Sequence, residues 1–159
     1  MAPSWRFYLL PLLTSGGLLM AGCRKSADPV PPPTQTTLLT GPKWRVTANT
    51  FTESANGVTR TEDTYAKTRG CYLDNYVKFN RDQTLTLDEG PTTCPQSVPQ
   101  NLTYAWKFNA DESALLYGPD ASSYATYEVR QLTAATLHLR QTVTAPNYQA
   151  VFDVTYSAF

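Results

Sequence analysis

The amino-acid sequence predicts an all-β domain that closes as an antiparallel up-and-down barrel of about eight strands. From Lys43 onward, apolar and polar residues alternate with a period of two in eight short runs, as in strands with one buried face. Most of these runs are separated by only a few residues, which favours antiparallel neighbours. Thr and Tyr are abundant, and both suit a half-buried pleated surface. Eight sequential antiparallel strands close most simply as a barrel.

The predicted strands follow one another along the chain and are mostly joined by short turns. In chain order they cover residues 44–48, 76–80, 84–87, 104–108, 115–117, 127–132, 137–143 and 148–156. The segment from Glu53 to Gly70 lacks clear alternation, so we expect it to have local structure or to cover one end of the barrel. Thr61 to Thr64 could start a short helix, although its capping pattern is incomplete.

The N-terminus has the features of a bacterial signal peptide, predicted to span residues 1–22. Arg6 supplies a positive charge, and the apolar run from Phe7 to Met20 is shorter than the ~20 residues that span a bilayer. The residues from Leu19 to Cys23 resemble the bacterial lipobox, in which a cysteine becomes acylated. We therefore expect Cys23 to carry acyl chains such as palmitate and to anchor the protein in a membrane. The alternative is ordinary secretion with an incidental cysteine.

Residues 23–40 are predicted to form the lipidated cysteine and an extended, proline-rich tether, and residues 41–159 the barrel domain. Pro29 and Pro31 to Pro33 lie within the tether, and nothing in it is periodic. This organisation predicts a lipid-anchored protein of the bacterial cell envelope, located at the outer membrane.

Cys71 and Cys94 flank the first predicted hairpin and are expected to form a disulfide bond. The leader places the domain outside the cytoplasm, where disulfides persist. Closing a loop of this length stabilises a fold by roughly 3 kcal/mol in chain-entropy models. The alternative is a thiol pair with catalytic or metal-binding work, but the spacing fits neither a CxxC redox motif nor a zinc knuckle.

Several short motifs resemble those of the lipocalin-like domain proteins of Bacteroidetes-type bacteria. The resemblance covers most of Leu38 to Phe159 and rests on the segments Gly41–Trp44, Cys71–Asn75 and Tyr127–Thr133, together with Phe79, Asp82, Cys94 and Trp106. It implies a small β-barrel, often attached to a membrane by lipid and usually without an assigned ligand.

One set of large apolar side chains shares the face predicted to point into the barrel: Trp44, Phe79, Leu87, Trp106, Tyr127, Leu139 and Phe152. These side chains could line a cavity for a small apolar ligand, because a barrel of ~8 strands can hold one. Alternatively, they fill the barrel as an ordinary core.

Other kinds of chemistry find little support in the sequence. The formal net charge is +0, without the clusters of Lys and Arg that bind nucleic acid. His138 is the only histidine and is expected on the face opposite Leu137 and Leu139, so no metal site is predicted. The acidic pair Asp88–Glu89 and a similar pair at residues 111–112 fall at strand ends or turns, where solvated carboxylates are usual. We therefore predict no enzyme and no cofactor, but an anchored barrel that binds a small apolar ligand. The alternative is a filled barrel that acts as a structural or protein-interaction module of the envelope.

Overall fold

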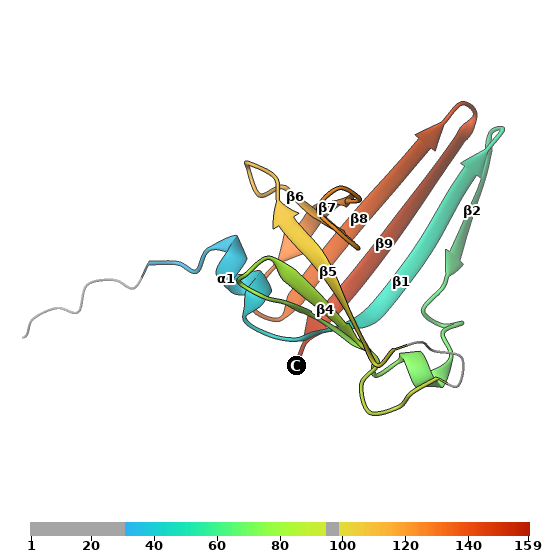
Figure 1. The fold of residues 1–159 in the computed structure, drawn as a ribbon. Helices are drawn as coiled ribbons and strands as arrows, with labels where there is room; N and C mark the ends of the chain where they lie inside the picture. Colours follow the sequence, from blue (N-terminus) through green and yellow to red (C-terminus); the bar gives the residue numbers. More distant parts are fainter. Residues whose placement is uncertain (1–30, 95–98) are drawn as a thin grey trace, which may run out of the picture. The chain divides into compact units, whose positions relative to one another are not determined.

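A single antiparallel sheet closes on itself in this fold because its first long strand pairs with its last (Figure 1). The computed structural model describes residues 31–94 and 99–159, so the predicted signal peptide and Cys23 lie outside the described residues. Two short helices are described: α1 (Gln35–Thr40) and the 3-10 helix η1 (Gly70–Tyr72). The described strands are β1 (Trp44–Ala55), β2 (Val58–Asp63), β3 (Tyr76–Phe79), β4 (Thr84–Asp88), β5 (Asn101–Phe108), β6 (Ala114–Gly118), β7 (Ala125–Leu132), β8 (Thr136–Ala145) and β9 (Tyr148–Ala158).

The predicted eight-stranded up-and-down barrel is confirmed. From β3 to β9, each strand pairs antiparallel with the next one along the chain. The ladder between β1 and β9 runs from Trp44 opposite Ala158 to Ala55 opposite Tyr148, and it closes the barrel. The eight runs of alternating residues correspond to β1 and β3 through β9.

The strands β2 and β3 together fill one position of the barrel. A strand has only two hydrogen-bonding edges, and β9 occupies one edge of β1 along its whole length. Therefore β2, which pairs with residues 50–55, and β3, which pairs with Trp44, share the other edge. Residues 64–75 separate β2 from β3 and interrupt what would otherwise be one strand. Between Trp44 and Thr50, this edge of β1 has no strand beside it in the part of the chain that the structure describes.

The strand β2 corrects the expectation of a short helix at Thr61 to Thr64. All of its residues are exposed, so its sequence has no apolar alternation that would predict it. The turn before it explains the hairpin, because Asn56 and Gly57 have φ values of 50° and 80°. Positive φ at both central residues is typical of a type I′ turn, which joins two antiparallel strands tightly.

A bulge in β1 overturns the predicted alternation at Ala48. The register against β9 shifts between Val46 and Ala48, so one extra residue enters β1. Such an insertion reverses the faces of the residues that follow it. As a result, Ala48 is exposed, and Asn49 lies opposite Val154 on the inner face.

Two long hairpins, β1–β2 and β8–β9, continue beyond the shorter strands of the barrel (Figure 1). Their tips meet, since the amide of Asn56 donates to the carbonyl of Asn147 at 3.1 Å. We call this four-stranded extension, residues 50–63 and 140–153, the flap. One face of the flap continues the barrel interior, whereas the other carries Thr and Ser side chains that hydrogen bond across β1 and β2.

The barrel core is a continuous apolar cluster closed at one end by α1. It contains Leu39, Trp44, Phe79, Leu85, Trp106, Leu115, Leu137 and Leu139. Helix α1 begins after Thr34, whose hydroxyl accepts the Thr37 amide at 3.1 Å. The side chain of Leu39 is 0% exposed, and its carbonyl accepts the Trp44 indole N–H at 2.8 Å. The prediction of an extended tether is thus wrong for residues 35–40, because Leu39 adds to the core and holds this segment in place.

Candidate functional site

A cavity of about 760 Å³ lies beside the interrupted strand. The lining comes from β1, the end of the inserted segment 64–75, β3, β9, and β4 and β5 with the residues next to them: Trp44, Val46, Tyr72, Asn75, Tyr76, Val77, Leu87, Asp88, Glu89, Pro99, Gln100, Leu102 and Tyr156. Its volume falls in the range of pockets that bury small molecules, roughly 300–1,000 Å³. Residues 45–49 of β1 have no strand paired with them on the side of the segment 64–75. This gap in the ladder explains why the barrel is hollow at this place.

The disulfide bond between Cys71 and Cys94 fixes the loops beside the cavity. It confirms the predicted pairing, with the two Cα atoms 5.4 Å apart. Cys71 lies in η1 next to the cavity-lining Tyr72, so the bond ties η1 to the segment that follows β4. The amide of Glu89 donates to the carbonyl of Gln100 at 3.1 Å and extends the β4–β5 ladder along the same rim.

Apolar side chains form the inner wall of the cavity. Trp44 separates the cavity from the packed core, because it belongs to the core cluster and also lines the cavity. Val77 and Leu87 are cross-strand partners on the inner face, and Leu102 pairs with Leu87 on the same face. A ligand placed here would remove this apolar surface from water, which is the main source of affinity in such pockets.

The carboxylate of Asp88 at the rim is held by hydrogen bonds. It accepts the Tyr76 hydroxyl at 2.8 Å, the Gly90 amide at 2.7 Å and the Gln100 side-chain amide at 3.2 Å. Burial alone would raise the pKa of Asp88, but these donors and the charge of Lys43 outweigh burial and lower it. Asp88 is therefore ionised at neutral pH and fixed in orientation.

Three tyrosines occupy the barrel interior next to the cavity. The rings of Tyr117 and Tyr127 stack with centroids 4.3 Å apart and an interplanar angle of 6°. Burial and the neighbouring Tyr156 and Tyr127 raise the pKa of Tyr117 far above its ordinary value. Burial also raises the pKa of Tyr156, which lines the cavity, to about 12. The hydroxyls of Tyr117 and Tyr156 therefore stay neutral at physiological pH and can only donate or accept hydrogen bonds.

The structure divides the predicted ligand-binding residues between core, cavity and flap. Trp44 and Leu87 line the cavity. Tyr127 packs against the core and stacks on Tyr117. The packed core contains three other members that point inward, Phe79, Trp106 and Leu139. Within it, the rings of Phe79 and Trp106 meet edge to face with their centroids 5.6 Å apart. The barrel is thus filled at one end and hollow at the side of the interruption.

Phe152 is not among the residues that line the cavity. Phe152 has the predicted parity, but it lies on the flap, beyond the level of the shorter strands. Its side chain is 38% exposed and packs against Phe51, with ring centroids 4.9 Å apart. Tyr156, four residues later on the same face, takes the place in the cavity wall that was expected for Phe152.

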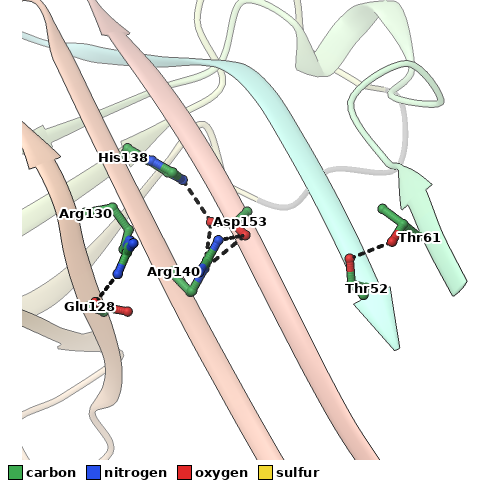
Figure 2. A network of polar contacts seen from close by, with 7 residues as sticks. All are labelled: Thr52, Thr61, Glu128, Arg130, His138, Arg140 and Asp153. Atoms are coloured by element: carbon green, nitrogen blue, oxygen red, sulfur yellow. Dashed lines mark hydrogen bonds and ion pairs between the residues drawn. The ribbon is translucent and has the colours of Figure 1, made fainter. Parts of the chain in front are cut away.

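His138 lies on the outer face of β8, as predicted, and joins a polar network there. Figure 2 shows His138 and Arg140 reaching the carboxylate of Asp153 on the neighbouring strand. The Nε2 atom of His138 is 2.8 Å from Oδ1, and Arg140 donates through Nη2 at 2.7 Å and Nε at 3.0 Å to Oδ2. Among the described residues, no group of three or more His, Cys, Asp or Glu side chains is placed to hold a metal ion. The network therefore links strands rather than forming a metal site.

Helices give no membrane-crossing element in the described part of the chain. Neither α1 nor η1, nor any other helix within residues 31–94 and 99–159, is long and apolar enough to span a bilayer.

The barrel and its cavity define a class of small antiparallel β-barrels with a pocket in the barrel wall. Two solved structures resemble the chain, each at 11% sequence identity. One is a lipocalin-like protein from Bacteroides uniformis, with a TM-score of 0.38 over 72% of this chain and 96% of that protein. The other is bovine odorant-binding protein in complex with a selenium-containing odorant, with a TM-score of 0.43 over 84% of this chain and 78% of that protein. No family model matches the sequence, and no curated protein matches it.

Proposed function

We propose that this protein binds a small, largely apolar molecule in the cavity beside the interrupted strand. The observation that carries the proposal is the cavity itself, about 760 Å³ with an apolar inner wall and a polar rim. A barrel that only filled its interior would leave no such space next to Trp44, so the cavity favours ligand binding over the filled-barrel alternative.

The expected affinity is moderate. Drug-sized ligands gain about 0.3 kcal/mol per non-hydrogen atom. A ligand of about 25 such atoms would therefore bind with about 7.5 kcal/mol, which corresponds to a dissociation constant in the micromolar range.

We further propose that the protein is a lipoprotein of the bacterial cell envelope, anchored at the outer membrane through acyl chains on Cys23. The lipobox-like sequence before Cys23 and the leader with Arg6 support this proposal. The disulfide between Cys71 and Cys94 supports an oxidising compartment outside the cytoplasm. The barrel would then present its cavity to molecules of the envelope, and the membrane would be the partner of the anchor alone.

Fluorescence of the neutral probe N-phenyl-1-naphthylamine tests the ligand proposal. The protein is the full secreted chain with Cys23→Ser, so that no acyl chains compete for the cavity. We expect saturable binding of about one probe per chain with a micromolar dissociation constant. Leu102→Trp should weaken binding by filling the rim of the cavity. The matched control Val143→Trp, on an equally exposed strand residue of the flap, should not. Absence of saturable binding, or equal binding by both variants, would refute the proposal.

Membrane fractionation tests the anchor separately. Cys23→Ser should release the protein from the membrane fraction into the soluble envelope fraction. Retention of the variant in the membrane to the same extent as the original chain would exclude Cys23 as the anchor.

A further inference from the structure

The charged side chains that line the cavity are all acidic. Two carboxylates, Asp88 and Glu89, are among the lining residues, and no Lys, Arg or His is among those that the structure describes. One basic group, Lys43, contacts a lining residue, since its Nζ lies 4.1 Å from the centroid of the Tyr76 ring. Lys43 does not line the cavity.

Glu89 is one of the residues that line the cavity. It follows Leu85 and Leu87 at intervals of two residues, so it continues their inner face just beyond the end of β4. Its backbone is fixed by the hydrogen bond to Gln100. None of the ion pairs within residues 31–94 and 99–159 involves its carboxylate. Asp88, in contrast, already accepts three hydrogen bonds at the rim.

Aromatic rings stand around the same space. The cavity lining includes Trp44 from β1, Tyr72 from η1 and Tyr156 from β9. The faces of aromatic rings carry negative potential and attract ammonium groups within about 6 Å. The contact of Lys43 with the Tyr76 ring is an instance of this attraction at the border of the cavity.

We infer that the preferred ligand is an amphiphilic organic cation, in which a protonated amine or a quaternary ammonium group is joined to an apolar body. This inference rests on the proposed ligand-binding function and adds the charge of the ligand. The apolar body would contact Val77, Leu87 and Leu102, and the cationic group would lie between the Glu89 carboxylate and the rings of Tyr72 and Tyr156. A fatty-acid carboxylate would meet like charges at Asp88 and Glu89, and no basic side chain is among the described residues that line the cavity.

Three ligands with the same apolar chain separate the inference from the proposed function. Decylamine, decanol and decanoate, each kept below its micellar concentration, are titrated into the full secreted Cys23→Ser chain at pH 7 by calorimetry. We expect decylamine to bind about tenfold more tightly than decanoate, with decanol between them. Added salt should reduce this preference, because it screens charges near the surface. If decanoate or decanol binds as tightly as decylamine, the inference is wrong but the proposed function stands. If none of the three binds, the proposed function itself fails.

A matched pair of variants tests the role of Glu89. Glu89→Gln removes the charge and keeps the shape, and we expect about fivefold weaker binding of decylamine, the effect of one partly exposed ion pair. Its affinity for decanol should not change. The control Glu112→Gln removes a carboxylate from the turn between β5 and β6, away from the cavity lining, and should leave both affinities unchanged. Equal loss of decylamine and decanol binding in Glu89→Gln would show a merely structural role. Unchanged decylamine binding would also overturn the assignment.

Discussion

Shortening the side chain of Leu39 should cost more stability than any other change in α1, because Leu39 joins this helix to the barrel core. Leu39 is 0% exposed and belongs to the cluster that contains Trp44 and Phe79. Replacing a fully buried Leu by Ala loses the transfer free energy of the removed atoms and leaves a cavity, together about 3 kcal/mol. For a domain of this size, that corresponds to a fall in the melting temperature of about 10 °C.

Leu38→Ala is the matched control for Leu39→Ala. It removes the same atoms one position earlier, from a side chain that is only half-buried. Thermal unfolding followed by circular dichroism, and urea unfolding followed by the fluorescence of the tryptophans, would measure both variants. We expect Leu39→Ala to lose at least twice as much free energy of unfolding as Leu38→Ala. Equal losses would mean that α1 does not close the barrel and that the folded domain begins at Gly41, as the sequence predicted.

Three further predictions concern the loops and the outer surface. Replacing Cys71 and Cys94 together by Ser should lower the free energy of unfolding by about 3 kcal/mol and weaken probe binding, because η1 is released; unchanged binding in the folded variant would contradict the role of the disulfide at the cavity. Asp153→Asn should cost about 1 kcal/mol at pH 7 and remove part of the acid sensitivity. Burial alone would raise the pKa of Asp153, but its arginine and histidine partners outweigh burial and lower it. Its stabilising effect is therefore present above the unfolded-state pKa of about 3.9 and is lost as the pH falls through the lower folded-state pKa, which urea unfolding between pH 2 and 7 would show. Gly118→Ala should destabilise the fold strongly, since a Cβ atom there would lie 1.9 Å from the carbonyl oxygen of residue 123, whereas Gly70→Ala meets nothing within 4 Å; similar melting temperatures for these two variants would refute this account.

The barrel could be predicted from sequence because its pattern is local. A strand with one face on the core must alternate apolar and polar residues, and this requirement is visible in each run of about five residues. Both partners of a hairpin also lie close together in the sequence, as with β3 and β4. The strand β2 violates the first condition, since none of its residues is buried, and only the Asn56–Gly57 turn marks it. The bulge near Thr47 leaves no such mark, because it depends on how β1 fits β9, about a hundred residues away.

The cavity could be predicted only in part, because alternation gives the face of a residue but not its level along the barrel. Phe152 and Tyr156 have the same parity on β9, yet one lies on the exposed flap and the other lines the cavity. That difference depends on where the shorter strands end. Tyr72 lies in a loop without periodicity and reaches the cavity through the disulfide-bonded segment, which no local pattern describes.

The interruption between β2 and β3 connects these features physically. An uninterrupted strand would offer backbone partners to residues 45–49 of β1, and its side chains would fill the space next to Trp44. The inserted segment instead leaves this edge of β1 without a ladder, except that the Asn49 carbonyl accepts the amides of Thr64 and Tyr65. A flexible insertion would remove the stabilising hydrogen bonds of the ladder and would add no stabilising interaction in their place. The bond from Cys71 restrains the insertion by linking it to the segment that follows β4. The covalent link therefore offsets the lost backbone hydrogen bonds, and the same segment that opens the barrel wall also supplies part of the cavity lining.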